Sequence, residues 1–145
     1  MNFQILTKDI RDVCCVAERL FIAQIQFNLI RVPRFSSHQT HSEQIMQHFL
    51  DLVAAHGATE RKVAFYVEQL RLTPNHLSSV IRQQSGQTVM QWLNERTILQ
   101  AKVLLKHSDL SSSDITFRLG FTEATLFSRF FRRETDMTPK EYRER

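Results

Sequence analysis

Two stretches of the chain repeat one pattern. Residues 73–93 (TPNHLSSVIRQQSGQTVMQWL) align with residues 122–143 (TEATLFSRFFRRETDMTPKEYR) when the second copy carries one extra residue. Apolar positions, a serine, a threonine and an arginine coincide. The matched pairs are Leu77 and Phe127, Val80 and Phe130, Ile81 and Phe131, Arg82 and Arg132, Ser78 and Ser128, Thr88 and Thr138, and Trp92 and Tyr142. The chain therefore contains the same kind of helix twice.

Each copy reads as a short helix, a tight turn and a second helix. In the first copy we expect Thr73 to cap the second helix and Pro74 to take its first position, where the missing N–H costs nothing. In the second copy Gly120 supplies the turn and Thr122 is the expected cap. This order is helix-turn-helix, and its second helix can enter the major groove of DNA.

The second helix of the second copy is amphipathic. At 100° per residue, Phe127, Phe130 and Phe131 fall on one side, and polar and basic residues fall on the other. The outer side holds Thr125, Ser128, Arg129, Arg132 and Arg133. A core helix with a solvated outer face is the bland alternative for any single helix of this kind.

A long helix is expected between the two copies. Thr88 with Gln91, and Thr138 with Glu141, have capping-box spacing, so a fresh helix follows each copy. The first continues through residues 89–105 and is apolar on nearly every side, which indicates burial on more than one side. At ~1.5 Å per residue it predicts a rod of about 25 Å joining two subdomains. Residues 111–114 provide caps for the next short helix.

The composition favours an all-helical chain. Only 3 glycines and 3 prolines occur in 145 residues, and strand-like alternation is almost absent. No apolar run approaches the ~20 residues that span a bilayer, and the N-terminus lacks signal-peptide features, so we expect a cytoplasmic protein with no membrane partner.

The positive charge lies in the second half. Acidic and basic residues cancel in residues 1–58, so the formal net charge of +4 arises after them. A basic C-terminal region suggests a polyanionic partner, with nucleic acid ahead of membrane, and a merely solvated basic surface is the alternative.

Metal and enzyme chemistry are not expected. Cys14 and Cys15 are adjacent and point about 100° apart on a helix, which suits neither a disulfide nor a tetrahedral site. His38 and His41 lack carboxylate or cysteine company. The sequence shows no nucleophile with a base, no phosphate-cradling glycine loop and no metal cluster, so we expect no cofactor and no catalytic residues.

The chain from about residue 58 to residue 145 resembles the DNA-binding domain of AraC/XylS-type bacterial transcription regulators. The segments that carry the resemblance are FYVEQLRLTPNHLSSVIRQQSG, AKVLL and ITFRLGFTEATLFSRFFRRETDMTPKEYR. It implies a seven-helix domain whose two helix-turn-helix units enter adjacent major grooves on one face of DNA. Members of this family usually recruit RNA polymerase.

The resemblance also implies roles for individual residues. Base-contacting positions would be Asn75, Ser78 and Ser79 in the first reading helix, and Ala124, Thr125, Ser128 and Arg129 in the second. Phosphate-contacting positions would be Thr73, Arg82, Arg132 and Arg133.

The chain departs from the family pattern at a few positions. Asp136 stands where the family has the glycine present here as Gly86, and aspartate tolerates a left-handed turn better than most residues. Thr116 and Val67 stand where the family favours alanine, so slightly looser packing is expected there.

Residues 1–57 are expected to form a helical segment that precedes the DNA-binding domain of residues 58–145. Apolar stripes run through residues 10–21 and 22–29, and a third, at residues 45–53, follows a capping box of Thr40 and Glu43. Two core helices packed on each other, or a helical hairpin that also dimerises, explain these stripes equally well. The segment is either a dimerisation element or the end of a sensor domain.

The sequence thus predicts an all-α chain with two helix-turn-helix subdomains joined by a linker helix and preceded by a helical hairpin. Its predicted function is sequence-specific binding of double-stranded DNA by a transcription regulator that is not an enzyme and that recruits RNA polymerase. The alternative is a helical adaptor whose basic helices dock on an acidic protein.

Overall fold

The computed structural model describes Arg19 and residues 40–145, and every regular element within residues 40–145 is helical. The expected stripes at residues 10–29, together with Cys14, Cys15 and His38, lie outside the described residues. The helices are α2 His41–His56, α3 Val63–Leu70, α4 Pro74–Ser85, α5 Val89–His107, α6 Ser112–Arg118, α7 Ala124–Thr135 and α8 Pro139–Glu144.

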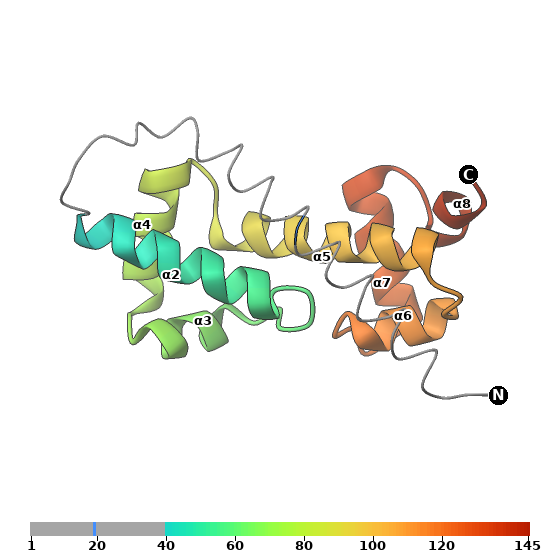
Figure 1. Ribbon diagram of the computed structural model, residues 1–145, viewed down its shortest axis with the longest axis horizontal. Helices are drawn as coiled ribbons and strands as arrows, with labels where there is room; N and C mark the ends of the chain where they lie inside the picture. Colours follow the sequence, from blue (N-terminus) through green and yellow to red (C-terminus); the bar gives the residue numbers. More distant parts are fainter. Residues whose placement is uncertain (1–18, 20–39) are drawn as a thin grey trace.

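Helix α5 is the axis on which the other helices are arranged (Figure 1). Its 19 residues make a rod of about 28 Å at ~1.5 Å per residue. Helices α4 and α7 lie near opposite ends of α5 and run transverse to it, both from bottom to top in Figure 1. The predicted linker helix is confirmed, and it continues two residues beyond the expected end.

Most of the expected helix starts are confirmed. Thr40, Thr88, Ser111 and Thr138 each form a capping box, in which the cap oxygen accepts from the backbone N–H three residues on and the side chain there accepts from the cap N–H. Thr73 caps α4, since its Oγ1 accepts from the N–H of His76 at 3.3 Å. These bonds satisfy backbone donors that the first turn of a helix leaves without partners.

The expected cap at Thr122 is wrong. Helix α7 begins at Ala124, its N-cap is Glu123, and no side-chain hydrogen bond caps it. The extra residue of the second copy lies in the turn between α6 and α7, so the helix starts one residue later than Thr122 would allow. The backbone of Glu123 is extended, as is that of Thr73, whereas the side chain of Glu123 accepts from the hydroxyl of Thr125 at 3.2 Å.

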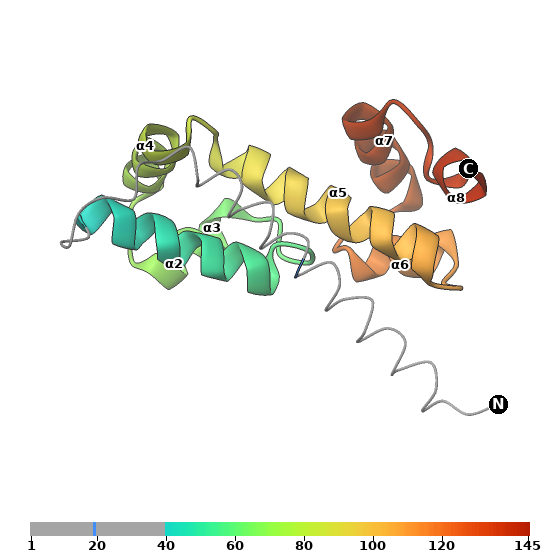
Figure 2. The same ribbon diagram turned by 45° about the horizontal axis from the view of Figure 1, so that its top comes forward.

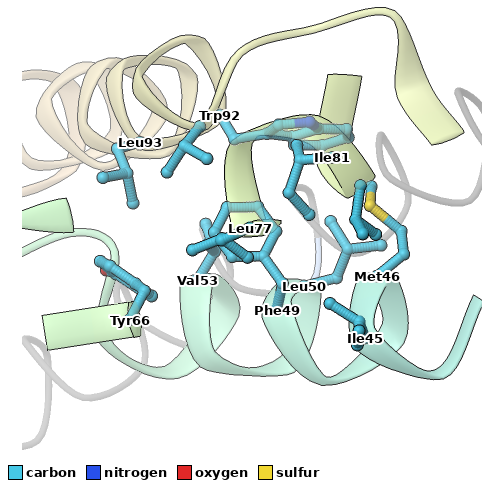
Figure 3. Close-up of a cluster of buried hydrophobic side chains, with 12 residues drawn as sticks. Ile45, Met46, Phe49, Leu50, Val53, Tyr66, Leu77, Ile81, Trp92 and Leu93 are labelled. Carbon is cyan, nitrogen blue, oxygen red and sulfur yellow. The ribbon is translucent and has the colours of Figure 1, made fainter. Parts of the chain in front are cut away.

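Helix α2 belongs to the core of the first helix-turn-helix unit (Figure 3). Phe49 and Val53 of α2 are completely buried, and they share one apolar cluster with residues of α3, α4 and α5. The cluster includes Ile45, Met46, Phe49, Leu50, Val53, Tyr66, Leu77, Ile81, Trp92 and Leu93.

The expected boundary after residue 57 would therefore separate α2 from the helices that it covers. The apolar stripe in residues 45–53 was identified in the sequence, but its partner is the first reading unit. Among the described residues, the double unit has seven helices, α2 to α8.

The core of the second unit is richer in aromatic rings. Phe127, Phe130 and Phe131 of α7 pack with Phe121, and the rings lie 5.2 to 5.8 Å apart between centroids. The matching residues of α4 are smaller and are backed by α2. In the described part of the chain, no helix backs α7 as α2 backs α4, and the larger rings take up that space.

Four backbone positions with positive φ shape the turns. Arg71 (φ 53°) and Gly120 (φ 74°) lie at equivalent places between the two helices of each unit, and Gly86 (φ 73°) and Asp136 (φ 60°) end the two reading helices. The expectation that Asp136 adopts the left-handed turn of Gly86 is confirmed. Each unit therefore has one glycine and one larger residue at its left-handed positions.

Candidate nucleic-acid interface

Helix α4 packs against the first core through its apolar side, and its other side is exposed to solvent. Leu77, Val80 and Ile81 are buried in the first core. The residues expected to read or hold DNA lie on the opposite side, and all are exposed: Thr73, Asn75, Ser78, Ser79 and Arg82. The buried positions are spaced i, i+3 and i+4, and this spacing gives the division because such positions share one face of a helix.

Helix α7 is divided in the same way. Its three buried phenylalanines fix it to the second core, and Ala124, Thr125, Arg129 and Arg132 are exposed. Ser128 is half-buried, so only part of its side chain is accessible. The interleaved phenylalanines and arginines therefore separate cleanly into an apolar back and a cationic front.

The two helices correspond residue by residue. Both have 12 residues, so Ser78 and Ser128, Ser79 and Arg129, and Arg82 and Arg132 occupy equivalent positions on them. On the outer side of α4 the side chains are short, and Ser79 occupies the position that Arg129 has on α7. The second unit therefore has the longer reach and the greater charge on its outer face.

Arg132 and Arg133 differ in their surroundings. Arg133 forms an ion pair with Glu134, with Nη2 2.6 Å from Oε1, and its guanidinium carbon lies 5.4 Å from the ring centroid of Phe130. Arg132 has no carboxylate within ion-pair distance in the part of the chain that the structure describes. Of the two, Arg132 is therefore the arginine whose charge is not offset by an ion pair within the described residues.

The first and second units touch at a seam that the sequence did not indicate. The guanidinium carbon of Arg61, which precedes α3, lies 4.3 Å from the ring centroid of Phe121 and 4.4 Å from that of Phe130. At the same seam, Gly120 lies against the backbone of Thr59. Partial burial is the main cause that lowers the pKa of Arg61, and the nearby Arg133 lowers it further, although arginine stays charged at any ordinary pH.

Three exposed apolar side chains of the described residues were also missed, and one of them is Met90 on α5, which is 43% exposed. Leu126, on the outer side of α7, is 46% exposed, and Phe117 on α6 is 64% exposed. The angular position of Leu126, two residues after Ala124, would have placed it on the outer face. It is the counterpart of His76, which is exposed on α4.

The described residues contain no group of three or more histidine, cysteine, aspartate or glutamate side chains that could hold a metal ion. Among the described helices, none has the length and apolar character that crossing a membrane requires.

The fold and its two outward-facing helices define a double helix-turn-helix protein. A family model described as a helix-turn-helix domain matches residues 66–145, more than half of the chain. The chain belongs to the AraC/XylS-type family of helix-turn-helix proteins. The resemblance seen in the sequence is thereby confirmed.

Two curated relatives show how much of a protein this chain corresponds to. The HTH-type transcriptional activator RhaS of Klebsiella pneumoniae (strain 342) is 32% identical over 133 residues, which cover 92% of this chain and 48% of RhaS. The HTH-type transcriptional activator RhaR of Cronobacter sakazakii (strain ATCC BAA-894) is 34% identical over 134 residues, covering 90% of this chain and 46% of RhaR. The chain spans about half the length of the curated relatives it matches.

Solved structures support the fold. The C-terminal domain of AraT, a response regulator from Geobacillus stearothermophilus, aligns with a TM-score of 0.67 at 23% identity, covering 72% of this chain and 88% of that domain. The DNA-binding domain of AdpA in complex with a target DNA aligns with a TM-score of 0.62 at 24% identity, covering 68% and 89%. The alignment with the AraT domain covers 72% of this chain, which is more than residues 58–145 make up. This agrees with α2 being packed as part of the fold.

Proposed function

We propose that this chain binds double-stranded DNA in a sequence-specific manner as part of a bacterial transcription regulator, with α4 and α7 in adjacent major grooves. The arrangement of these two helices carries the proposal. They have equal length, and each buries its apolar side. They lie near opposite ends of the same rod (Figure 2). The rod of about 28 Å between them is comparable with the ~34 Å of one turn of duplex.

The comparisons support this proposal in two ways. The relatives RhaS and RhaR are named transcriptional activators, and the AdpA domain was solved with its target DNA. By the same relationship we propose contact with RNA polymerase and action in the cytoplasm, where bacterial DNA lies. Self-association through residues 1–57 stays a prediction, and no enzymatic step is proposed.

Individual roles follow from the exposed faces. We propose that Asn75, Ser78 and Ser79 of α4 face base edges, together with Ala124, Thr125, Ser128 and Arg129 of α7. An arginine can donate two hydrogen bonds to guanine O6 and N7, so Arg129 should supply the stronger base preference. The short side chains of α4 should depend more on ordered water and on phosphate contacts. The proposed phosphate contacts are Thr73, Arg82, Arg132 and Arg133.

The test is selection of duplexes from a random library with the full chain, followed by titration of selected and scrambled duplexes at several salt concentrations. We expect enrichment of a motif in two parts whose centres lie about 10 base pairs apart, and affinity that falls steeply with salt. If no sequence is enriched and selected and scrambled duplexes bind alike, the proposed function is wrong. Binding to an acidic protein in place of DNA would then favour the adaptor.

A further inference from the structure

The seam between the two helix-turn-helix units centres on one cation and two aromatic rings. Arg61 comes from the first unit, whereas Phe121 and Phe130 belong to the second. Both rings lie within 4.5 Å of the guanidinium carbon, well inside the ~6 Å over which a cation is attracted to an aromatic face. One side chain of the first unit therefore contacts a ring in the turn before the second reading helix, Phe121, and a ring on that helix, Phe130.

The contact is made by stacking more than by hydrogen bonding. Nη2 of Arg61 lies 3.5 Å from Oδ1 of Asn94, the long limit for a hydrogen bond. Nη1 is buried and has no hydrogen-bond partner among the described residues. Phe130 is only 5% exposed. The half-buried guanidinium of Arg61 thus gives up part of its contact with solvent to lie against the two rings of the second unit.

The backbone that carries Arg61 is anchored close by. The carbonyl of Gly57 accepts a hydrogen bond from the hydroxyl of Thr97, on α5, at 3.2 Å. Two residues further on, the backbone of Thr59 touches Gly120, in the turn of the second unit. Residues 57–61 therefore connect the linker helix, the first unit and the turn before α7.

We infer that Arg61 is a positioning residue that fixes the orientation of α7 relative to α4 and so sets the spacing of the two DNA segments that the chain can read together. The inference rests on the proposed function for its DNA consequence. A single helix such as α5 bends and twists, and a small rotation at its middle becomes a large displacement of a reading helix at its end. The Arg61 stack restrains that rotation, because it joins the two units beside the rod.

The first test measures orientation in the absence of DNA. Spin labels are placed on cysteines introduced at Gln83 and Lys140, which are exposed in the first and second units, in a chain whose Cys14 and Cys15 are replaced by serine. Pulsed electron resonance then gives the distribution of distances between the labels. We expect one narrow distribution for this parent chain and a clearly broader one for Arg61→Ala.

Matched variants separate the stack from general loss of charge or stability. Lys62 is exposed and follows Arg61 directly in the chain. Lys62→Ala therefore removes the same charge as Arg61→Ala without touching the rings, and we expect it to keep the narrow distribution of distances. Arg61→Met keeps an unbranched chain over the rings and removes the planar cation, so it serves if Arg61→Ala fails to fold, and we expect broadening there too. A parental width in a folded Arg61 variant would overturn the inference.

The second test uses duplexes recovered with the unmodified chain, with one base pair inserted or deleted between the two parts of the motif. One base pair rotates the second part by about 35°, so we expect the unmodified chain to lose affinity roughly tenfold or more, near the cost of one mismatched pair. For Arg61→Ala we expect a smaller loss on the altered duplexes. An identical spacing dependence would overturn the inference while leaving DNA binding intact, whereas failure to recover any motif would count against the proposed function.

Discussion

Gly120 lies directly against the backbone of Thr59, and a Cβ built on Gly120 would be 2.3 Å from the Thr59 carbonyl oxygen. Gly120 also has a φ of 74°. We expect Gly120→Ala to lower the free energy of unfolding by about 3 kcal/mol, since it adds a clash with backbone to the strain of a left-handed residue. Urea denaturation followed by circular dichroism measures the loss.

Gly86 is the matched control for this prediction. Its φ of 73° is nearly the same, yet a Cβ there would meet nothing within 4 Å. Gly86→Ala should therefore cost about 1 kcal/mol, the backbone strain alone. Equal losses for the two variants would show that the approach to Thr59 adds nothing.

The two reading helices should respond differently to loss of the threonine before them. Thr73→Ala removes the bond that the side chain accepts from the N–H of His76, and we expect it to cost about 1 kcal/mol, as is usual for a cap. Thr122 caps nothing, because α7 begins after Glu123. Thr122→Ala should stay within about 0.5 kcal/mol of the parent in thermal or urea unfolding, and a cap-sized loss would contradict the observed start of α7.

Replacing the half-buried Glu95 with glutamine should raise the stability of the fold by an amount that depends on pH. Burial raises the pKa of Glu95, the hydrogen bond that its Oε1 accepts from Gln87 at 2.7 Å opposes this shift, and Glu134 adds to it. Because the folded pKa lies above the unfolded one, the contribution of Glu95 is most favourable below the unfolded pKa and is lost as the pH rises through the folded pKa. Glu95→Gln keeps the acceptor and removes the charge, so we expect it to stabilise the chain at pH 7.

Unfolding by urea at pH 7 and at about pH 4, near the unfolded pKa of a glutamate, tests this expectation. The gain should shrink at the lower pH. Glu68→Gln, on the exposed side of α3, controls for the removal of one negative charge. A gain as large for Glu68→Gln would assign the effect to net charge and not to burial.

Arg129 and Arg132 should have separable effects on DNA binding. Arg129→Ala should cost about 1–3 kcal/mol on the selected duplex and relax the preference at one or two base pairs, with little effect on random DNA. Arg132→Ala should weaken binding to both kinds of duplex and reduce the slope of log K against log salt by about one unit, as one lost phosphate contact does.

Titration of both variants against selected and scrambled duplexes at several salt concentrations distinguishes these roles. Equal losses on every sequence for Arg129→Ala would reject its contact with bases. If neither variant loses affinity, the outer face of α7 does not meet DNA.

Much of the fold could be predicted because its signals are local. A threonine or serine three residues before glutamate, glutamine or aspartate marks a helix start, and four such boxes occur where the pattern predicts them. The exposed and buried sides of α4 and α7 follow from helical periodicity in the same way. The face of each reading helix was therefore accessible from the sequence.

The contacts between helices could not be predicted from the sequence. The stripe of α2 shows that one face is apolar, but periodicity does not say which helices cover that face, and in the structure these are α3, α4 and α5. The contact of Arg61 with Phe121 and Phe130 joins residues 60 and 69 positions apart along the chain, with no pattern at either end to connect them. The one-residue shift at Thr122 depended on where the alignment placed its extra residue.

Helix α2 packs behind α4, and among the described residues no corresponding helix packs behind α7. This difference limits whether the sequences of the two reading helices could be exchanged. If the α7 sequence replaced that of α4, the rings of Phe127, Phe130 and Phe131 would compete for the space that Phe49 and Val53 of α2 already fill. In the opposite exchange, Leu77, Val80 and Ile81 would leave a void where no such helix stands. The sequences of α4 and α7 therefore each fit only their own unit, and neither could replace the other.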